Sequence, residues 1–234
     1  MSLQQHQQFT QQIVGNYICS YGILPSPKSG GDINDFFKIS DSKYGIYLID
    51  VAGIGKSSVT AIKQVKDLII SLALSEQQTL YSQNPELLLQ QTNLAVYNAK
   101  LGKYLTLIYG VLDLESNYFN YSIAGHYPNP ILLDQNGHAK YLFGKGFPIG
   151  ILPNATFEKF TIQIPTNNSI LLFSDGIMRF LMPHENMEYR SNYLLNIICN
   201  SKAEIRLLLQ NLKLNENTPN ITDDIAITII NKSK

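Results

Sequence analysis

Four aspartates in this sequence stand beside glycine or at the end of an apolar run. Asp32 follows a pair of glycines, whereas Asp50, Asp175 and Asp223 flank runs rich in Ile, Leu and Val. Aspartate is a poor strand residue, and a carboxylate beside an apolar run is costly unless something pairs with it. If the strands lie side by side, the carboxylates repel each other, and hard divalent cations such as Mg²⁺ or Mn²⁺ would relieve that repulsion. The pattern therefore predicts metal-assisted phosphate chemistry.

The elements that must position these acids are mostly hairpins. The spacing of apolar and turn residues predicts strands at 13–23, 35–39, 44–49, 104–114, 118–124, 130–133, 139–143, 157–164, 169–173 and 225–230. Helical periodicity and helix-start signals predict helices at 57–74, 84–100, 189–200 and 203–214. Because the helices are grouped and do not alternate with strands, the order indicates an α+β fold with antiparallel sheets.

Length and composition are those of one globular domain. The chain has 234 residues, and 44% of them are hydrophobic, which is enough for a sizeable core. Lys plus Arg and Asp plus Glu number 18 each, so no basic surface for nucleic acid is indicated. We expect a linker or a remnant of expression at residues 1–12 and the domain at residues 13–234. We see no signal peptide or membrane span, and we expect reduced cysteines in a cytoplasmic protein.

Six short motifs follow one another along the domain. They are Gly30-Gly31-Asp32, Asp50-Val51-Ala52-Gly53-Ile54-Gly55, Ala124-Gly125-His126, Gly146-Phe147-Pro148-Ile149-Gly150, Ser174-Asp175-Gly176 and Asp223-Asp224-Ile225-Ala226. Each motif is weak by itself, but their order resembles that of the SpoIIE/RsbU-type branch of the PP2C-like (PPM) serine/threonine phosphatases. This resemblance implies a β-sandwich of two antiparallel sheets flanked by helices.

The same resemblance implies a centre of two Mn²⁺ or Mg²⁺ ions. By the motif match, Asp50 would bridge both ions, and Asp175 and Asp223 would complete one metal site. Asp32 would hold the other ion together with the backbone carbonyl of Val51. Asp50 and Asp175 are thus the expected catalytic residues.

Three further residues are candidates with weaker support. Asp224 is the alternative ligand to Asp223, but Asp224 leads directly into the last predicted strand, so we favour Asp223. His126 could act as a general acid, although a structural histidine in a tight turn is the better interpretation. Lys56 could contact phosphate, although a solvated lysine is the default. One departure from the family pattern is Arg179, which stands where many members carry glutamate.

The predicted activity is hydrolysis of phosphoserine or phosphothreonine in a protein. Two cations lower the pKa of a water molecule that they share and stabilise the charge on the phosphoryl oxygens. In the resembling family the substrate is often a phosphorylated STAS-type anti-sigma-factor antagonist. Such phosphatases commonly form the output domain of a bacterial signalling protein, behind a sensor or receiver module that these residues do not include.

Two other functions compete with this prediction. Residues 50–58 run from a strand through Gly53, Gly55, Lys56 and Ser57 into a helix, which is close to the phosphate-binding loop of an NTPase. Asp50 stands where that loop requires glycine, and a carboxylate there would face the phosphates. A catalytically silent domain that binds a partner is the second alternative.

Overall fold

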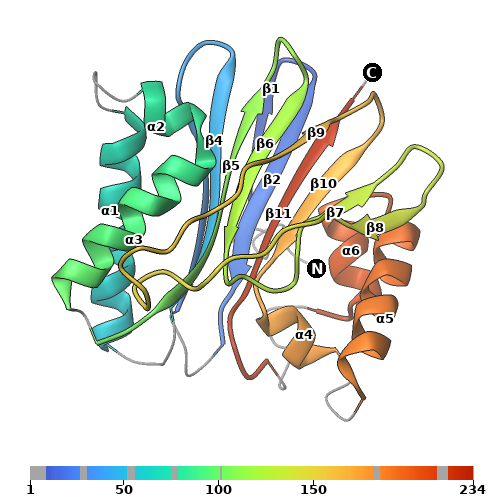
Figure 1. The fold of residues 1–234 in the computed structure, drawn as a ribbon. Coiled ribbons are helices and arrows are strands. Elements are labelled where there is room, and N and C mark those ends of the chain that lie inside the picture. The colour runs from blue at the N-terminus through green and yellow to red at the C-terminus, as the bar shows by residue number, and fades with distance from the viewer. Residues whose placement is uncertain are drawn as a thin grey trace. The chain divides into compact units, whose positions relative to one another are not determined.

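The computed structural model describes residues 9–26, 31–51, 56–74, 79–100, 102–181, 185–214 and 221–233, with the backbone alone at 56–62, 79 and 82. The strands (Figure 1) are β1 (Phe9–Val14), β2 (Tyr17–Leu24), β3 (Asp32–Lys38), β4 (Lys43–Val51), β5 (Leu105–Asp113), β6 (Tyr118–Ala124), β7 (Ile131–Leu133), β8 (Ala139–Tyr141), β9 (Phe160–Gln163), β10 (Ser169–Phe173) and β11 (Ile225–Lys232). The helices are α1 (Lys56–Leu74), α2 (Thr79–Gln83), α3 (Pro85–Ala99), α4 (Gly176–Phe180), α5 (Met187–Ser201) and α6 (Ile205–Asn211).

The chain divides into two compact units, each built around one antiparallel sheet. The first unit contains residues 1–29, 128–142 and 165–234, and the second contains residues 30–127 and 143–164. The sheet of the first unit has the strand order β1-β2-β11-β10-β7-β8, and that of the second has the order β3-β4-β5-β6-β9. Each unit is therefore assembled from segments that are far apart in the sequence.

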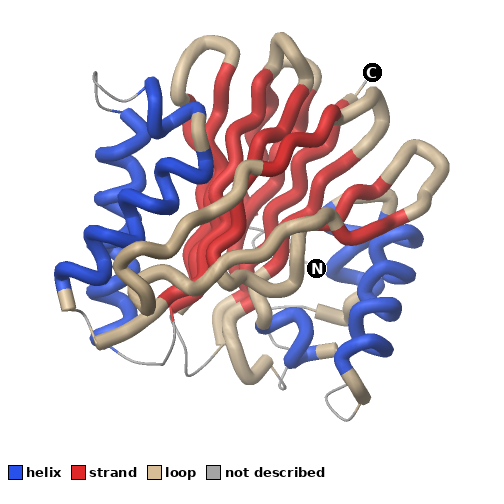
Figure 2. The backbone as a smooth tube through the Cα atoms, in the orientation of Figure 1, coloured by secondary structure: helices blue, strands red, loops and turns tan. Residues whose placement is uncertain are grey.

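In the second unit, α1 and α3 pack on one face of the sheet. Helix α1 contacts β4, and α3 contacts β5 and β6 (Figure 2). The apolar side chains of β4 and β5 alternate, and every second one enters the core beneath the helices. These core residues of the two strands are Tyr47, Ile49, Val51, Leu105, Leu107, Tyr109 and Val111.

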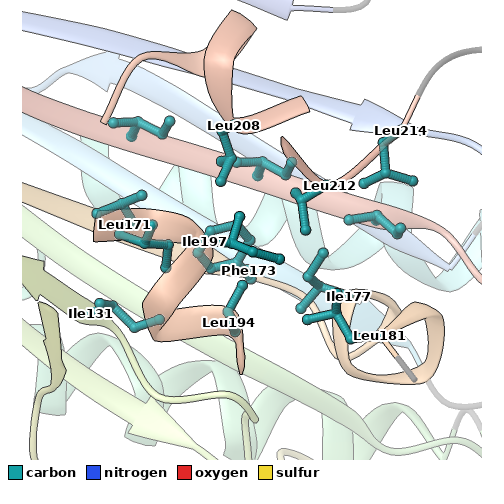
Figure 3. Close-up of a cluster of buried hydrophobic side chains, with 14 of the residues drawn as sticks. Ile131, Leu171, Phe173, Ile177, Leu181, Leu194, Ile197, Leu208, Leu212 and Leu214 are labelled. Carbon is teal, nitrogen blue, oxygen red and sulfur yellow. The ribbon is translucent and has the colours of Figure 1, made fainter. Parts of the chain in front are cut away.

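In the first unit, α4, α5 and α6 cover the sheet and share its core. Figure 3 shows this cluster, in which side chains of β10 and β11 meet those of the three helices. Leu171 and Phe173 enter from β10, Ile177 from α4, Leu194 from α5 and Leu208 from α6. Burial of large aliphatic and aromatic side chains is the main stabilising term for such a unit, at about 25 cal/mol per Å² of apolar surface.

The prediction of two antiparallel sheets flanked by helices is confirmed. The expected strand at 13–23 is wrong in detail, because the chain turns at Gly15, where φ is 54°, and makes the hairpin β1–β2. Strand β1 begins at Phe9, so residues 9–12 of the expected linker belong to the sheet. Helices α2 and α4 were not expected, because five residues are too few to show a helical period. Among the described residues, we find no helix that is both long and apolar enough to span a membrane.

Candidate active site

Asp32 and Asp50 lie side by side on the hairpin of β3 and β4. The register pairs Asp32 with Asp50, and it pairs Asp50 with Thr106 of β5. The backbone N–H of Val51 donates to the carbonyl oxygen of Gly31 at 2.9 Å. Because bonded and non-bonded pairs alternate along an antiparallel ladder, the adjacent Asp32–Asp50 pair is of the non-bonded kind, in which side chains lie closest. The hairpin therefore brings two carboxylates together through its backbone alone.

The two carboxylates occupy the sheet face that α1 and α3 do not cover. Ile49 and Val51 point into the core beneath these helices, so Asp50 between them points to the other face. Asp32 and Asp50 are both partly exposed. Like charges opposite each other on a sheet are destabilising unless a cation lies between or beside them. Paired carboxylates of this kind supply the hard oxygen donors that Mg²⁺ and Mn²⁺ prefer.

His126 lies in a tight turn that is joined to the strand next to Asp50. Its Nδ1 is 2.9 Å from the hydroxyl oxygen of Thr106, and the histidine is only 4% exposed. Gly125 before it has φ of 63°, and a Cβ there would overlap the ring of Pro148. The turn therefore requires glycine, and it holds the imidazole in a buried position.

Ser174 ends the pairing of β10 with β11. Its backbone N–H donates to the carbonyl oxygen of Ala226 at 3.0 Å, and its hydroxyl oxygen accepts from the N–H of Ala226 at 2.9 Å. Gly176 then begins α4 so close to β11 that a Cβ would overlap the carbonyl oxygen of Asp224. This close approach brings Asp175, at the start of α4, beside the residues that precede β11.

Asp175 and Asp223 are held together by Arg179. The guanidinium donates from Nε and Nη2 to Oδ2 of Asp175 at 3.2 and 2.7 Å, and its Nη1 lies 2.9 Å from Oδ2 of Asp223. The side chains of the two acids are 30% and 25% exposed. Partial burial is the largest cause that raises the pKa of Asp223, the Asp175 charge adds to it, and Arg179 opposes it. This acid pair therefore already has one cationic partner.

Asp224 has different surroundings from its neighbour. It is 3% exposed, and its Oδ1 accepts a hydrogen bond of 2.8 Å from the backbone N–H of Ser26. The backbone N–H of Asp224 in turn donates to Oδ1 of Asp223 at 3.0 Å. Asp224 thus connects the segment after β2 to the start of β11, whereas Oδ2 of Asp223 faces Arg179.

The shared sequence pattern suggested that the strands next to the four acids lie side by side in one sheet. The structure does not place them in one sheet. Strands β3 and β4 are adjacent in one sheet, and strands β10 and β11 are adjacent in the other sheet. Within the described ranges, no group of three or more His, Cys, Asp or Glu side chains stands ready as a ligand set. Gly30, residues 52–55 and the side chain of Lys56 lie outside the described residues.

Sequence reasoning did not assign a role to Arg179 or to Thr106. The spacing of Asp175 and Arg179 by four residues on a helix is a readable signal for an ion pair, but the five-residue helix itself gave no pattern. Thr106 could be found only through the register of β4 and β5, which places it opposite Asp50.

The NTPase alternative is not favoured by the sheet. Strand β4, which would precede the phosphate-binding loop, pairs antiparallel with both of its neighbours, β3 and β5. The strand–loop–helix unit that binds nucleotide phosphates belongs instead to parallel sheets with helical crossovers. The glycine and lysine pattern after β4 therefore lies in a different sheet topology from the one that a phosphate-binding loop of an NTPase requires.

Comparison with known proteins agrees with the fold and the motifs. The family model described as Stage II sporulation protein E (SpoIIE) matches residues 40–232, which include Asp50, Asp175 and Asp223 but not Asp32. Phosphoserine phosphatase RsbP of Bacillus subtilis (strain 168) is 26% identical over 156 residues, which are 65% of this chain and 38% of that protein. Phosphoserine phosphatase RsbU of the same organism is 25% identical over 155 residues, 66% of this chain and 44% of that protein. The chain thus spans less than half the length of both relatives.

Two solved structures have the same fold. The PP2C phosphatase domain of SpoIIE from Bacillus subtilis, solved with a fragment of its regulatory domain, has a TM-score of 0.69 at 16% identity, covering 93% of this chain and 62% of that one. RsbX, solved in complex with magnesium, has a TM-score of 0.68 at 18% identity, covering 96% of this chain and all of that one. Because the family model covers most of the chain, the protein belongs to the SpoIIE family.

Proposed function

We propose that this chain is a metal-dependent phosphatase that hydrolyses phosphoserine or phosphothreonine in a protein substrate. The observation that carries the proposal is the direct pairing of Asp32 with Asp50 across β3 and β4, in a member of the SpoIIE family. A pair of adjacent, partly exposed carboxylates is unfavourable in the absence of a cation and favourable in its presence. A divalent ion bound at this pair would offset the repulsion between the two carboxylates.

In this proposal two Mn²⁺ or Mg²⁺ ions are held by the side chains of Asp32, Asp50, Asp175 and Asp223 and by the carbonyl of Val51. Asp50 and Asp175 are the acids on which turnover depends most. All four side chains carry hard oxygen donors and are partly exposed, and the related RsbX was solved with magnesium. Bound ions of this kind supply an activated water for attack on phosphorus and offset the charge that develops on the phosphoryl oxygens.

Asp223, rather than Asp224, is the ligand in this proposal. Asp224 is buried and its Oδ1 already accepts from the backbone of Ser26, so its carboxylate serves the fold. Oδ2 of Asp223 contacts the guanidinium of Arg179, and the side chain of Asp223 is 25% exposed. A cation from solvent can therefore reach this carboxylate. We assign His126 a structural role, because it is buried in a turn against Thr106. Contact of Lys56 with phosphate stays a prediction from the sequence.

For the protein substrate we propose a phosphorylated STAS-type anti-sigma-factor antagonist, or a signalling protein of that kind. The support is that RsbP and RsbU, with which this chain shares about a quarter of its aligned residues, are named phosphoserine phosphatases. We further propose that a sensor or receiver module controls the activity in a bacterial regulator. The expected cytoplasmic location likewise stays a prediction.

The proposal is tested by hydrolysis of p-nitrophenyl phosphate after treatment of the protein with a chelator. We expect no turnover until Mn²⁺ or Mg²⁺ is restored, and no restored turnover in Asp50→Asn. Asp41→Asn is the matched control, because Asp41 is a fully exposed acid of the same unit that pairs with Lys38 across a turn. The phosphorylated protein substrate is then tested under the same conditions.

Three results would contradict the proposal. Turnover that persists in the chelator would exclude the metal centre. Mn²⁺ binding without turnover of either substrate would favour the alternative of a catalytically silent domain that binds a partner. Stabilisation by ATP alone, without phosphatase activity, would revive the nucleotide-binding alternative.

A further inference from the structure

One cationic side chain already occupies part of the proposed metal centre. Arg179 places three nitrogens of its guanidinium against Asp175 and Asp223, at distances of 3.2, 2.7 and 2.9 Å. Both carboxylates use Oδ2 for these contacts. The planar fork of a guanidinium can bridge two carboxylates in this way, whereas a lysine ammonium is a single point charge.

The oxygen atoms that Arg179 occupies are those that a shared metal ion would need. Oδ1 of Asp223 accepts from the backbone N–H of Asp224, so Oδ2 is the oxygen that faces outward from this segment. The bridge compensates one of the two negative charges and leaves a net charge of about −1 for the three groups. A divalent ion that binds both Oδ2 atoms competes with the guanidinium for the lone pairs of these oxygens.

Asp175 is held by the packing of α4, whereas the side chain of Arg179 is largely exposed. Asp175 lies at the start of α4, and Ile177 of that helix and Leu181, which directly follows it, are buried in the core (Figure 3). The carbonyl of Met178 in the same helix accepts from Nη1 of Arg190 at 3.2 Å, which ties α4 to α5. The side chain of Arg179 is 57% exposed.

We propose that Arg179 is a built-in competitor for the metal ion at the Asp175–Asp223 pair. In the absence of metal, the guanidinium stabilises the two adjacent carboxylates. Metal binding to the two Oδ2 atoms competes with these three contacts, so the affinity is lower than the two carboxylates alone would give. The inference rests on the proposed metal-dependent function, and it makes Arg179 a residue that sets how much metal the enzyme needs.

The test is the Mn²⁺ affinity of the chelator-treated protein, measured by isothermal titration calorimetry without substrate. We expect Arg179→Gln to bind Mn²⁺ about tenfold more tightly than the wild type, as loss of a competing ion pair of moderate strength would give. Arg179→Lys should lie between them, because an ammonium cannot span both acids. Arg206→Gln is the matched control, since Arg206 is an exposed arginine of the same unit on α6.

Thermal unfolding gives a second readout that a purely structural role would not produce. Without metal, Arg179→Gln should melt at a lower temperature than the wild type, because the two carboxylates lose their counter-charge. At saturating Mn²⁺ the gain in melting temperature should be larger in Arg179→Gln than in the wild type. If Arg179 only supported the fold, Arg179→Gln would lower the melting temperature by the same amount without metal and at saturating Mn²⁺.

The outcomes separate this inference from the function on which it rests. Equal or weaker Mn²⁺ affinity in Arg179→Gln, with normal binding by the wild type, would overturn the competitor role and leave the metal centre intact. No Mn²⁺ binding by the wild type or by Arg179→Gln would overturn the metal centre and the inference together. If Arg179→Gln does not fold, an affinity of Arg179→Lys equal to or below that of the wild type overturns the inference.

Discussion

The two acidic pairs of this protein are positioned in different ways. Asp32 and Asp50 face each other across a hairpin, and the backbone ladder of β3 and β4 fixes their spacing. Asp175 and Asp223 lie where β10 ends and β11 begins, and a side chain, Arg179, bridges them. The first pair is therefore a property of strand register, whereas the second depends on one close backbone approach and on one cation.

This difference separates what is rigid from what can be adjusted. A change of register at β3 and β4 would move whole side-chain rows, so the first pair can hardly vary without loss of the sheet. At the second pair, the cation is a single exposed side chain, so we expect the proposed metal affinity there to change when that side chain is replaced. We expect the two pairs to respond differently to mutation.

The largest effect is expected from Asp50→Asn, which removes one charge from the pair set by register. Activity should fall by about 10³-fold or more, because the remaining oxygens no longer hold the ions that offset the phosphoryl charge. The free energy of unfolding of the metal-free protein should hold or rise, because a like-charge contact is lost. Hydrolysis of p-nitrophenyl phosphate measures the activity, and urea unfolding measures the free energy of unfolding. Activity of Asp50→Asn near that of the wild type would contradict a role of the Asp32–Asp50 pair in turnover.

Gly176→Ala tests the close approach on which the second pair depends. The new Cβ would overlap the carbonyl oxygen of Asp224, so the junction of β10 and α4 must shift. We expect a loss of about 3 kcal/mol in the free energy of unfolding. Gly102→Ala is the control, because Gly102 has φ of 66° but open space around its Cα, and should lose only about 1 kcal/mol. Equal losses, measured by urea unfolding, would mean that the overlap is relieved at no cost.

Asp224→Ala and Asp223→Ala divide structure from metal binding at the same place in the chain. Loss of the buried Asp224 leaves the N–H of Ser26 without this acceptor and should cost about 2 kcal/mol of stability. Loss of the partly exposed Asp223 should cost less than about 1 kcal/mol, yet it should weaken Mn²⁺ binding far more. Calorimetry of metal binding and urea unfolding of both variants decide this. The reverse result would make Asp224 the ligand.

The smallest effect is expected from Thr106→Val, beside the first pair. The valine keeps the shape but removes the hydroxyl that lies 2.9 Å from Nδ1 of His126. Stability should fall by about 1 kcal/mol, and turnover at saturating Mn²⁺ should stay within about tenfold of the wild type. A much larger loss of turnover with unchanged stability would indicate that His126 acts in the chemistry.

The sequence predicts the first pair better than the second for a physical reason. The hairpin of β3 and β4 has a clear turn, so strands were expected at 35–39 and 44–49, and extending their pairing by a few residues places Asp32 opposite Asp50. Helix α4 has only five residues, which is too short for a period, and its Arg179 was noted only as a departure from a family pattern. The hairpin β1–β2 was missed because its two-residue turn, Gly15-Asn16, was taken as part of one continuous strand. Pairing between sequence-distant strands, such as β2 with β11, cannot be obtained from local pattern at all.

The position of β11 has a consequence for how the protein is made. This strand lies between β2 and β10, yet it follows every other strand of its sheet in the chain. While the ribosome is still translating the preceding residues, β2 and β10 have no strand between them and their hydrogen-bonding edges stay open. We therefore expect nascent chains to be more prone to aggregation than the finished protein, because unpaired strand edges are templates for association.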